Sequence, residues 1–181
     1  MSLIDTSNIP ATKPRRFKVA IPRPKGPVGN PGSTAGQMYG LGPMARVTTA
    51  YGEYHAQTLR VGDRVLTKSG EFIPIKSIDR VTFDSDYLAY HPKVQPILIR
   101  AGALAQRVPT ADVLLAPYQR IHASQTLARP AVATAVDALG GPHVCRKPET
   151  MITYTVLGFD RDAVIRCEGL WLDVESSKLA A

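Results

Sequence analysis

Cysteine is scarce in this sequence of 181 residues. The two cysteines, Cys145 and Cys167, could form at most one disulfide, so they do not define a disulfide framework. The histidines are scattered along the chain, at His55, His91, His122 and His143. No Cys-x-x-Cys motif and no closely spaced pair of histidines brings several metal ligands together. We therefore expect neither a metal site nor a cofactor.

Long apolar runs are missing as well. No stretch approaches the roughly eighteen apolar residues that a membrane-spanning helix needs. The first seventeen residues, MSLIDTSNIPATKPRRF, contain no apolar core of a secretory signal. These absences leave the location open, and we expect either the cytoplasm or the inside of an assembled particle. At this length one domain is expected, with residues left over for an arm.

The net charge of +7 is concentrated near the N-terminus. Residues 1–43 hold six lysines and arginines but one acid, together with seven prolines and six glycines. A segment of this composition has too few large apolar residues to form its own core, so we predict an extended arm over 1–43. Its alternating stretch could add a strand to the sheet edge of a partner protein. The predicted partner-binding residues are Arg15, Arg16, Phe17, Lys18, Val19 and Ile21.

Residues 44–181 have a different pattern, in which short apolar and β-branched runs alternate with turn residues. The runs lie at 46–49, 63–67, 72–75, 78–81, 97–99, 113–115, 154–157 and 164–165. Many short β-type runs at close spacing predict a mostly β domain. Residues 124–139 have helical composition that Pro130 interrupts, so a short helix on the β core is expected there.

Three stretches, in order along the chain, carry a family resemblance. The first is LRVGDRVLT at 59–67, which follows a strand-like ARVTT at 45–49. The second is PILIRAGAL at 96–104 with VLLAP at 113–117, and the third is FDR at 159–161 with VIRCEG at 164–169. Together they resemble the Hint (hedgehog/intein) domains of bacterial proteins, especially an alphaproteobacterial-type subgroup. The resemblance implies a compact Hint-like all-β domain over 44–181.

The resemblance also implies a self-processing chemistry, an acyl shift begun by a cysteine at the first position of the domain and assisted by histidines. A thiol is a good nucleophile, and imidazole can move protons near neutral pH. In this chain Gly40 stands at the place of the cysteine, and Gln119 at that of one histidine. Val156 and Asp162 replace two further histidines. The domain is therefore expected to be degenerate and not an enzyme.

Three functions remain open. The first is a structural or interaction component of a larger protein assembly, such as a virion, anchored by the arm. The second is a self-cleaving domain with an unusual nucleophile, Ser33 or Thr34. The third is nucleic-acid binding, in which the basic side chains of the arm contact phosphates. These side chains are Lys13, Arg15, Arg16, Lys18, Arg23 and Lys25.

Other reactive or charged residues have ordinary structural interpretations. We predict that Cys167 is a small buried residue and that Asp63 and Glu168 belong to turns and hydrogen-bond networks. A loop could expose Cys145 beside positive charge, which would make its thiol reactive. His122 lies three residues after Gln119 and is expected to point away from the position that Gln119 occupies.

Overall fold

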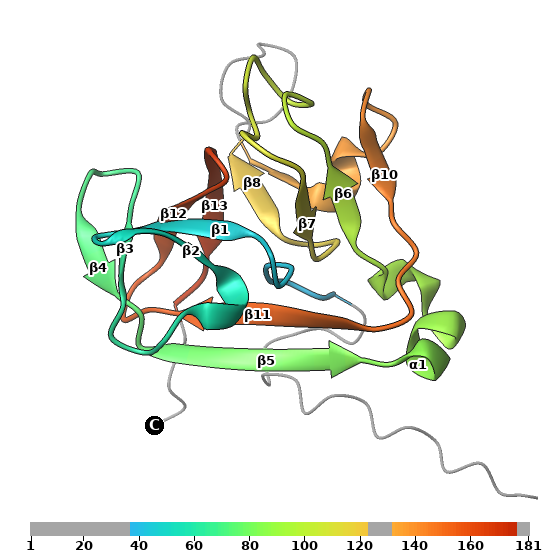
Figure 1. The fold of residues 1–181 in the computed structure, drawn as a ribbon, viewed down its shortest axis with the longest axis horizontal. Coiled ribbons are helices and arrows are strands. Elements are labelled where there is room, and N and C mark those ends of the chain that lie inside the picture. The colour runs from blue at the N-terminus through green and yellow to red at the C-terminus, as the bar shows by residue number, and fades with distance from the viewer. Residues whose placement is uncertain (1–36, 123–131, 177–181) are drawn as a thin grey trace, which may run out of the picture.

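A computed structural model describes residues 37–122 and 132–176. Thirteen strands dominate this part of the chain (Figure 1). The strands are β1 (Arg46–Thr49), β2 (Gly52–His55), β3 (Arg64–Leu66), β4 (Phe72–Pro74), β5 (Ser77–Phe83), β6 (Ile97–Ile99), β7 (Val113–Leu115), β8 (Arg120–His122), β9 (Ala133–Thr134), β10 (Val144–Arg146), β11 (Ile152–Gly158), β12 (Ala163–Cys167) and β13 (Leu170–Val174). The helical elements are α1 (Ser85–Tyr90) and the 3-10 turns η1 (Ala56–Thr58), η2 (Pro92–Val94) and η3 (Ala135–Ala138).

Three sheets make up the architecture. The largest has the order β4-β3-β1-β12-β13-β8-β9, with β2 also paired to β1. A three-stranded sheet follows the order β10-β6-β7, and β5 pairs with β11 over seven residues to form a two-stranded sheet. In Figure 1 the β5–β11 ribbon runs along one side of the molecule, with the other two sheets on the same side of it. The predicted mostly β fold is confirmed.

The core lies where the apolar faces of these sheets meet. Val47, Val65, Ile97, Leu115 and Ile165 are among the side chains with no exposed surface. A smaller apolar cluster, under α1, is centred on the buried ring of Tyr154, whose hydroxyl donates to the Val94 carbonyl at 2.8 Å. A buried hydroxyl needs such a partner, so this bond fixes η2 against β11.

All eight predicted β runs coincide with strands, whereas other elements were missed. β2 was not among the predicted runs; it pairs with β1 across a two-residue turn at Ala50 and Tyr51. The six-residue α1 was also missed, although Asp84 caps it through the Tyr87 amide. Residues 123–131 lie outside the described part of the chain, and they include Pro130 and the first half of the helix expected at 124–139. The rest forms strand β9 and turn η3.

The predicted arm overlaps the described residues only at 37–43. There Leu41 is 3% exposed and belongs to the main core cluster, so the folded part includes residues before position 44. The predicted partner-binding residues, from Arg15 to Ile21, lie outside the described residues. In the described part of the chain, no helix has the length and apolarity to cross a membrane.

Candidate functional site

Residues 38–42, here called the lead-in segment, thread between β7 and β11. On one side, Leu41 and Thr155 exchange two backbone hydrogen bonds of 2.9 Å. On the other side, the Gly42 amide donates to the Leu114 carbonyl at 2.8 Å, and the Ala116 amide donates to the Gly40 carbonyl at 3.0 Å. The lead-in segment is thus bonded on both edges, and its backbone position is fixed.

Gly40 sits in this segment with a backbone that side chains rarely tolerate. Its φ is +130°, in the region that favours glycine. A Cβ built on Gly40 would lie 3.0 Å from the Thr155 carbonyl oxygen and 3.3 Å from both Tyr154 Cβ and Val156 Cγ2. The position predicted to have lost the nucleophile therefore leaves little space for a larger residue and holds a backbone conformation that favours glycine.

Gln119 closes the site from the other side. Its side chain is buried, and its Oε1 accepts a hydrogen bond from the Gly40 amide at 3.1 Å. Its Nε2 donates to the carbonyls of Asp173 at 2.8 Å and Arg120 at 3.2 Å. Both ends of the amide are therefore satisfied. A neutral amide can hold these groups in place but cannot accept or release a proton at neutral pH.

The structure brings three of the four predicted site residues together. Val156, on β11, contributes an apolar side chain beside Gly40, and Gln119 contributes the polar contact to the Gly40 amide. Asp162 is separate: it lies in the turn between β11 and β12, where its Oδ1 accepts from the Ser176 amide at 2.6 Å. The assembled site, formed by Gly40, Gln119 and Val156, contains no group that titrates near neutral pH.

His122 and Asp173 form a pair that the sequence did not predict. The Nε2 of His122 lies 2.7 Å from Asp173 Oδ1, and both side chains are about one-fifth exposed. In the structure Ile121 is buried, and the imidazole of His122 contacts the carboxylate of Asp173 on the paired strand β13. The Asp173 carbonyl accepts the hydrogen bond from the Gln119 amide, and the Asp173 carboxylate contacts His122. His122 is thus engaged in holding β8 to β13.

Glu168 is a buried carboxylate with several partners, and it ties three segments together. Its side chain is 2% exposed and accepts from the backbone and guanidinium of Arg46 on β1, at 2.8 to 3.1 Å. Thr110, in the loop before β7, donates to it at 3.1 Å. Burial acts to raise the pKa of Glu168, but the hydrogen bonds and positive charge of Arg46 outweigh it, so the pKa lies below its usual range. This matches the network role predicted for Glu168.

The two cysteines differ in environment. Cys167 is completely buried on β12, and burial raises the pKa of its thiol strongly. Cys145 is exposed, but it lies on strand β10 and not in the predicted loop. Among the described residues, no group of three or more histidine, cysteine or acidic side chains is arranged to hold a metal ion.

Comparisons with known proteins give a family and several distant structural relatives. The chain is similar in structure to the gp41-1 intein (TM-score 0.47, 9% identity, 75% of this chain and 98% of that one). It is also similar to the MchDnaB-1 intein (TM-score 0.46, 10% identity, 75% and 99%). A third relative is the Msm DnaB1 intein splicing domain bound with zinc (TM-score 0.45, 12% identity, 75% and 99%). No curated protein matches the sequence.

The family model gives the decisive match. It describes the Hint domain and matches residues 40–178, most of the chain. This match begins at Gly40, the residue that the resemblance aligned with the first position of the domain. The predicted resemblance is confirmed: this chain belongs to the Hint domain family.

Proposed function

We propose that this protein is a Hint domain that no longer processes itself and serves as an interaction component of a larger protein assembly. One observation carries the first half of the proposal. At Gly40, where self-processing needs a nucleophilic side chain, a Cβ would approach the Thr155 carbonyl to 3.0 Å. The neighbouring polar group is the amide of Gln119, which cannot act as a proton donor or acceptor in an acyl shift.

Charge supports the second half. The described residues contain fourteen lysines and arginines and fourteen acids, so this part of the protein is close to neutral. The positive charge of the chain therefore comes mainly from residues 1–36. A basic segment attached to a neutral domain fits an arm that binds an acidic protein surface, with Phe17, Val19 and Ile21 forming one apolar face if it adds a strand there.

Mass spectrometry tests the loss of self-processing. The purified full-length protein is incubated with a thiol for a prolonged period, and we expect only the intact 19.6 kDa chain. A fragment that begins between residues 33 and 40 would show that Ser33, Thr34 or another group near the domain start acts as a nucleophile. Such a fragment would overturn the proposal in favour of a working self-cleaving domain.

Deletion of residues 1–36 tests the role of the arm. The truncated domain should keep its circular dichroism spectrum and a cooperative melt, because the lead-in segment and the core are retained. Size-exclusion chromatography of extracts of the source cells should show the full-length chain in a large complex and the truncated chain alone. A matched deletion of residues 1–12 keeps the basic cluster and should still assemble.

Two outcomes would contradict this part. An unfolded truncated protein would mean that residues 1–36 belong to the core. A truncated protein that still enters the complex would place the interface on the domain itself.

A DNA titration at low and high salt tests nucleic-acid binding by the arm, since phosphate contacts by the arm weaken steeply with salt. Tight, salt-sensitive binding to DNA that the 1–36 deletion abolishes would favour nucleic acid as the partner.

A further inference from the structure

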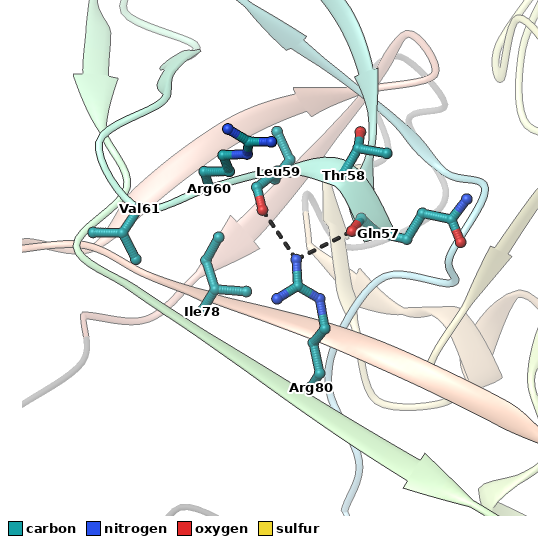
Figure 2. A pocket seen from close by; sticks show the side chains of 7 residues that line it. All are labelled: Gln57, Thr58, Leu59, Arg60, Val61, Ile78 and Arg80. Carbon is teal, nitrogen blue, oxygen red and sulfur yellow. Dashed lines mark hydrogen bonds between the residues drawn. The ribbon is translucent and has the colours of Figure 1, made fainter.

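An open pocket of about 640 Å³ lies on the face of β5, away from Gly40, between this strand and the segment that follows β2. The residues that line it are Gln57, Thr58, Leu59, Arg60, Val61, Ile78 and Arg80. Figure 2 shows the side chains of Ile78 and Arg80 extending from β5 toward the backbone at 57–61. Arg60 and Arg80 both line the pocket, and their side chains extend on opposite sides of the 57–61 backbone.

Arg80 is held in a fixed position. One of its terminal nitrogens, Nη2, donates to the Gln57 carbonyl at 3.1 Å and to the Leu59 carbonyl at 3.0 Å (Figure 2). These bonds occupy one end of a planar group that carries five N–H donors. Within the described residues no carboxylate pairs with Arg80, so the rest of its donor edge is available to a ligand.

Arg60 adds a second positive charge to the pocket. Its backbone amide donates to Asp63 Oδ2 at 2.8 Å, but its guanidinium has no ion pair in the described part of the chain. None of the residues lining the pocket is acidic. The remaining walls include Val61, which is 62% exposed, and the half-buried Ile78. Such a pocket suits a carboxylate on an aliphatic stem, because arginine binds carboxylates through paired hydrogen bonds.

The strand beside the pocket has a free edge. β5 pairs with β11 along all seven residues, and within the described residues it pairs with no other strand. An unpaired strand of this length offers its N–H and C=O groups to an added strand. A peptide strand added there would place alternate side chains on the face that carries Ile78 and Arg80.

We propose that this pocket binds an acidic side chain of an extended peptide segment of a partner protein, and that the segment adds as a strand to the free edge of β5. Main-chain hydrogen bonds to β5 would supply affinity, and the free donor edge of Arg80, together with the positive charge of Arg60, would select glutamate or aspartate at one position. The site does not involve residues 1–43. Its failure would therefore leave the anchoring role of the arm untouched, and failure of the arm would leave this site untouched.

Fluorescence anisotropy with the full-length protein tests the proposal. The probe is a labelled peptide of alternating glutamate and valine, and its counterpart replaces every glutamate with glutamine. The acidic peptide should bind, and the glutamine peptide should bind at least about tenfold more weakly, because it loses the charge-assisted hydrogen bonds. Equal binding of the two peptides, or no binding of the acidic one at low salt, would overturn the proposal.

Variants locate the binding. Arg60→Gln and Arg80→Gln should each weaken the acidic peptide by about tenfold. Arg100→Gln removes an exposed arginine outside the pocket and should bind as the unchanged protein does. Because Arg80 also holds two carbonyls, Arg60→Gln is the decisive variant if Arg80→Gln melts early. An equal loss in Arg100→Gln would mean attraction by overall charge and would refute a specific pocket.

Backbone amide NMR distinguishes strand addition from simple anion binding. With the acidic peptide, amide shifts should change along residues 77–83 as well as at 57–61. With inorganic phosphate or acetate alone, changes should be confined to 57–61 and Arg80. If the acidic peptide shifts only the amide signals of 57–61 and Arg80, the pocket binds anions and the proposed strand addition to β5 is wrong.

Discussion

Replacing Gly40 by cysteine restores the thiol that self-processing needs, and we expect that it restores no cleavage. One reason is chemical: Gln119 and Val156 cannot move protons, and Asp162 lies in the turn between β11 and β12, where it accepts from the Ser176 amide. The backbone gives a second. A cysteine at this position would hold a φ of +130°, and its Cβ would press on the Thr155 carbonyl at 3.0 Å.

The energetic cost can be worked from these two features. A side chain in a sparsely populated backbone region costs about 1–3 kcal/mol. Crowding a well-packed interior costs about 1–3 kcal/mol more, and withdrawal of the Thr155 carbonyl would strain its hydrogen bond from the Leu41 amide. The Gly40→Cys variant should therefore lose about 3 kcal/mol of unfolding free energy. In a domain of this size each kilocalorie corresponds to about 2–4 °C, so Tm should fall by about ten degrees.

Two assays check the reasoning. Thermal melts compare the unchanged protein with Gly40→Cys and with Gly40→Ala, which adds a Cβ without a thiol. The two variants should melt within a few degrees of each other and well below the glycine protein. Mass spectrometry after incubation with thiol should show the intact cysteine variant. An unchanged Tm, or a cleaved cysteine variant, would refute the steric argument at this position.

Further predictions concern groups away from Gly40. Arg46→Met should destabilise the protein by about 2–3 kcal/mol at pH 7, because it leaves Glu168 buried without its main partner. Since the pKa of Glu168 is lowered in the folded state, its stabilising contribution is present above the ordinary glutamate pKa and is lost as pH falls through the folded value. Urea titrations should show this acid loss in the unchanged protein and a smaller one in Arg46→Met; equal slopes would contradict the assignment. Gln119→Ala should cost about 1–3 kcal/mol in the same assay, because it strips buried backbone groups of their partner. Iodoacetamide should label Cys145 in the native protein but Cys167 only after unfolding, and native labelling at Cys167 would contradict its burial.

The sequence predicted the fold where local pattern and final structure coincide. β11 is an example, since its apolar and β-branched residues are buried on both faces. Prediction failed where an element is short or where a residue type typical of turns lies within it. In the structure Gly52 has a φ of +121°, in the region that favours glycine, yet this residue starts β2, paired with Thr49. α1 is only six residues long, so its apolar spacing carries little information beyond the Asp84 cap.

Some residues of the candidate site could likewise be predicted from the sequence, and others could not. The sequence identified Gly40, Gln119 and Val156 through the family resemblance, and the fold brings them together across separations of up to 116 residues. The same resemblance could not place Asp162, because the turn between β11 and β12 carries it toward Ser176. The His122–Asp173 pair and the Arg60–Arg80 pocket depend on strand register and loop course, which no local pattern reports.

The lead-in segment also has a mechanical consequence. It is bonded to β11 through Leu41 on one edge and to the segment around β7 through Gly42 and Gly40 on the other. A force that pulls the arm along its own direction would have to shear both rows of hydrogen bonds at once. Bonds that must break together resist far more than bonds that open one after another. A partner that pulls on the arm would therefore load a segment that is hydrogen-bonded to the domain on both edges.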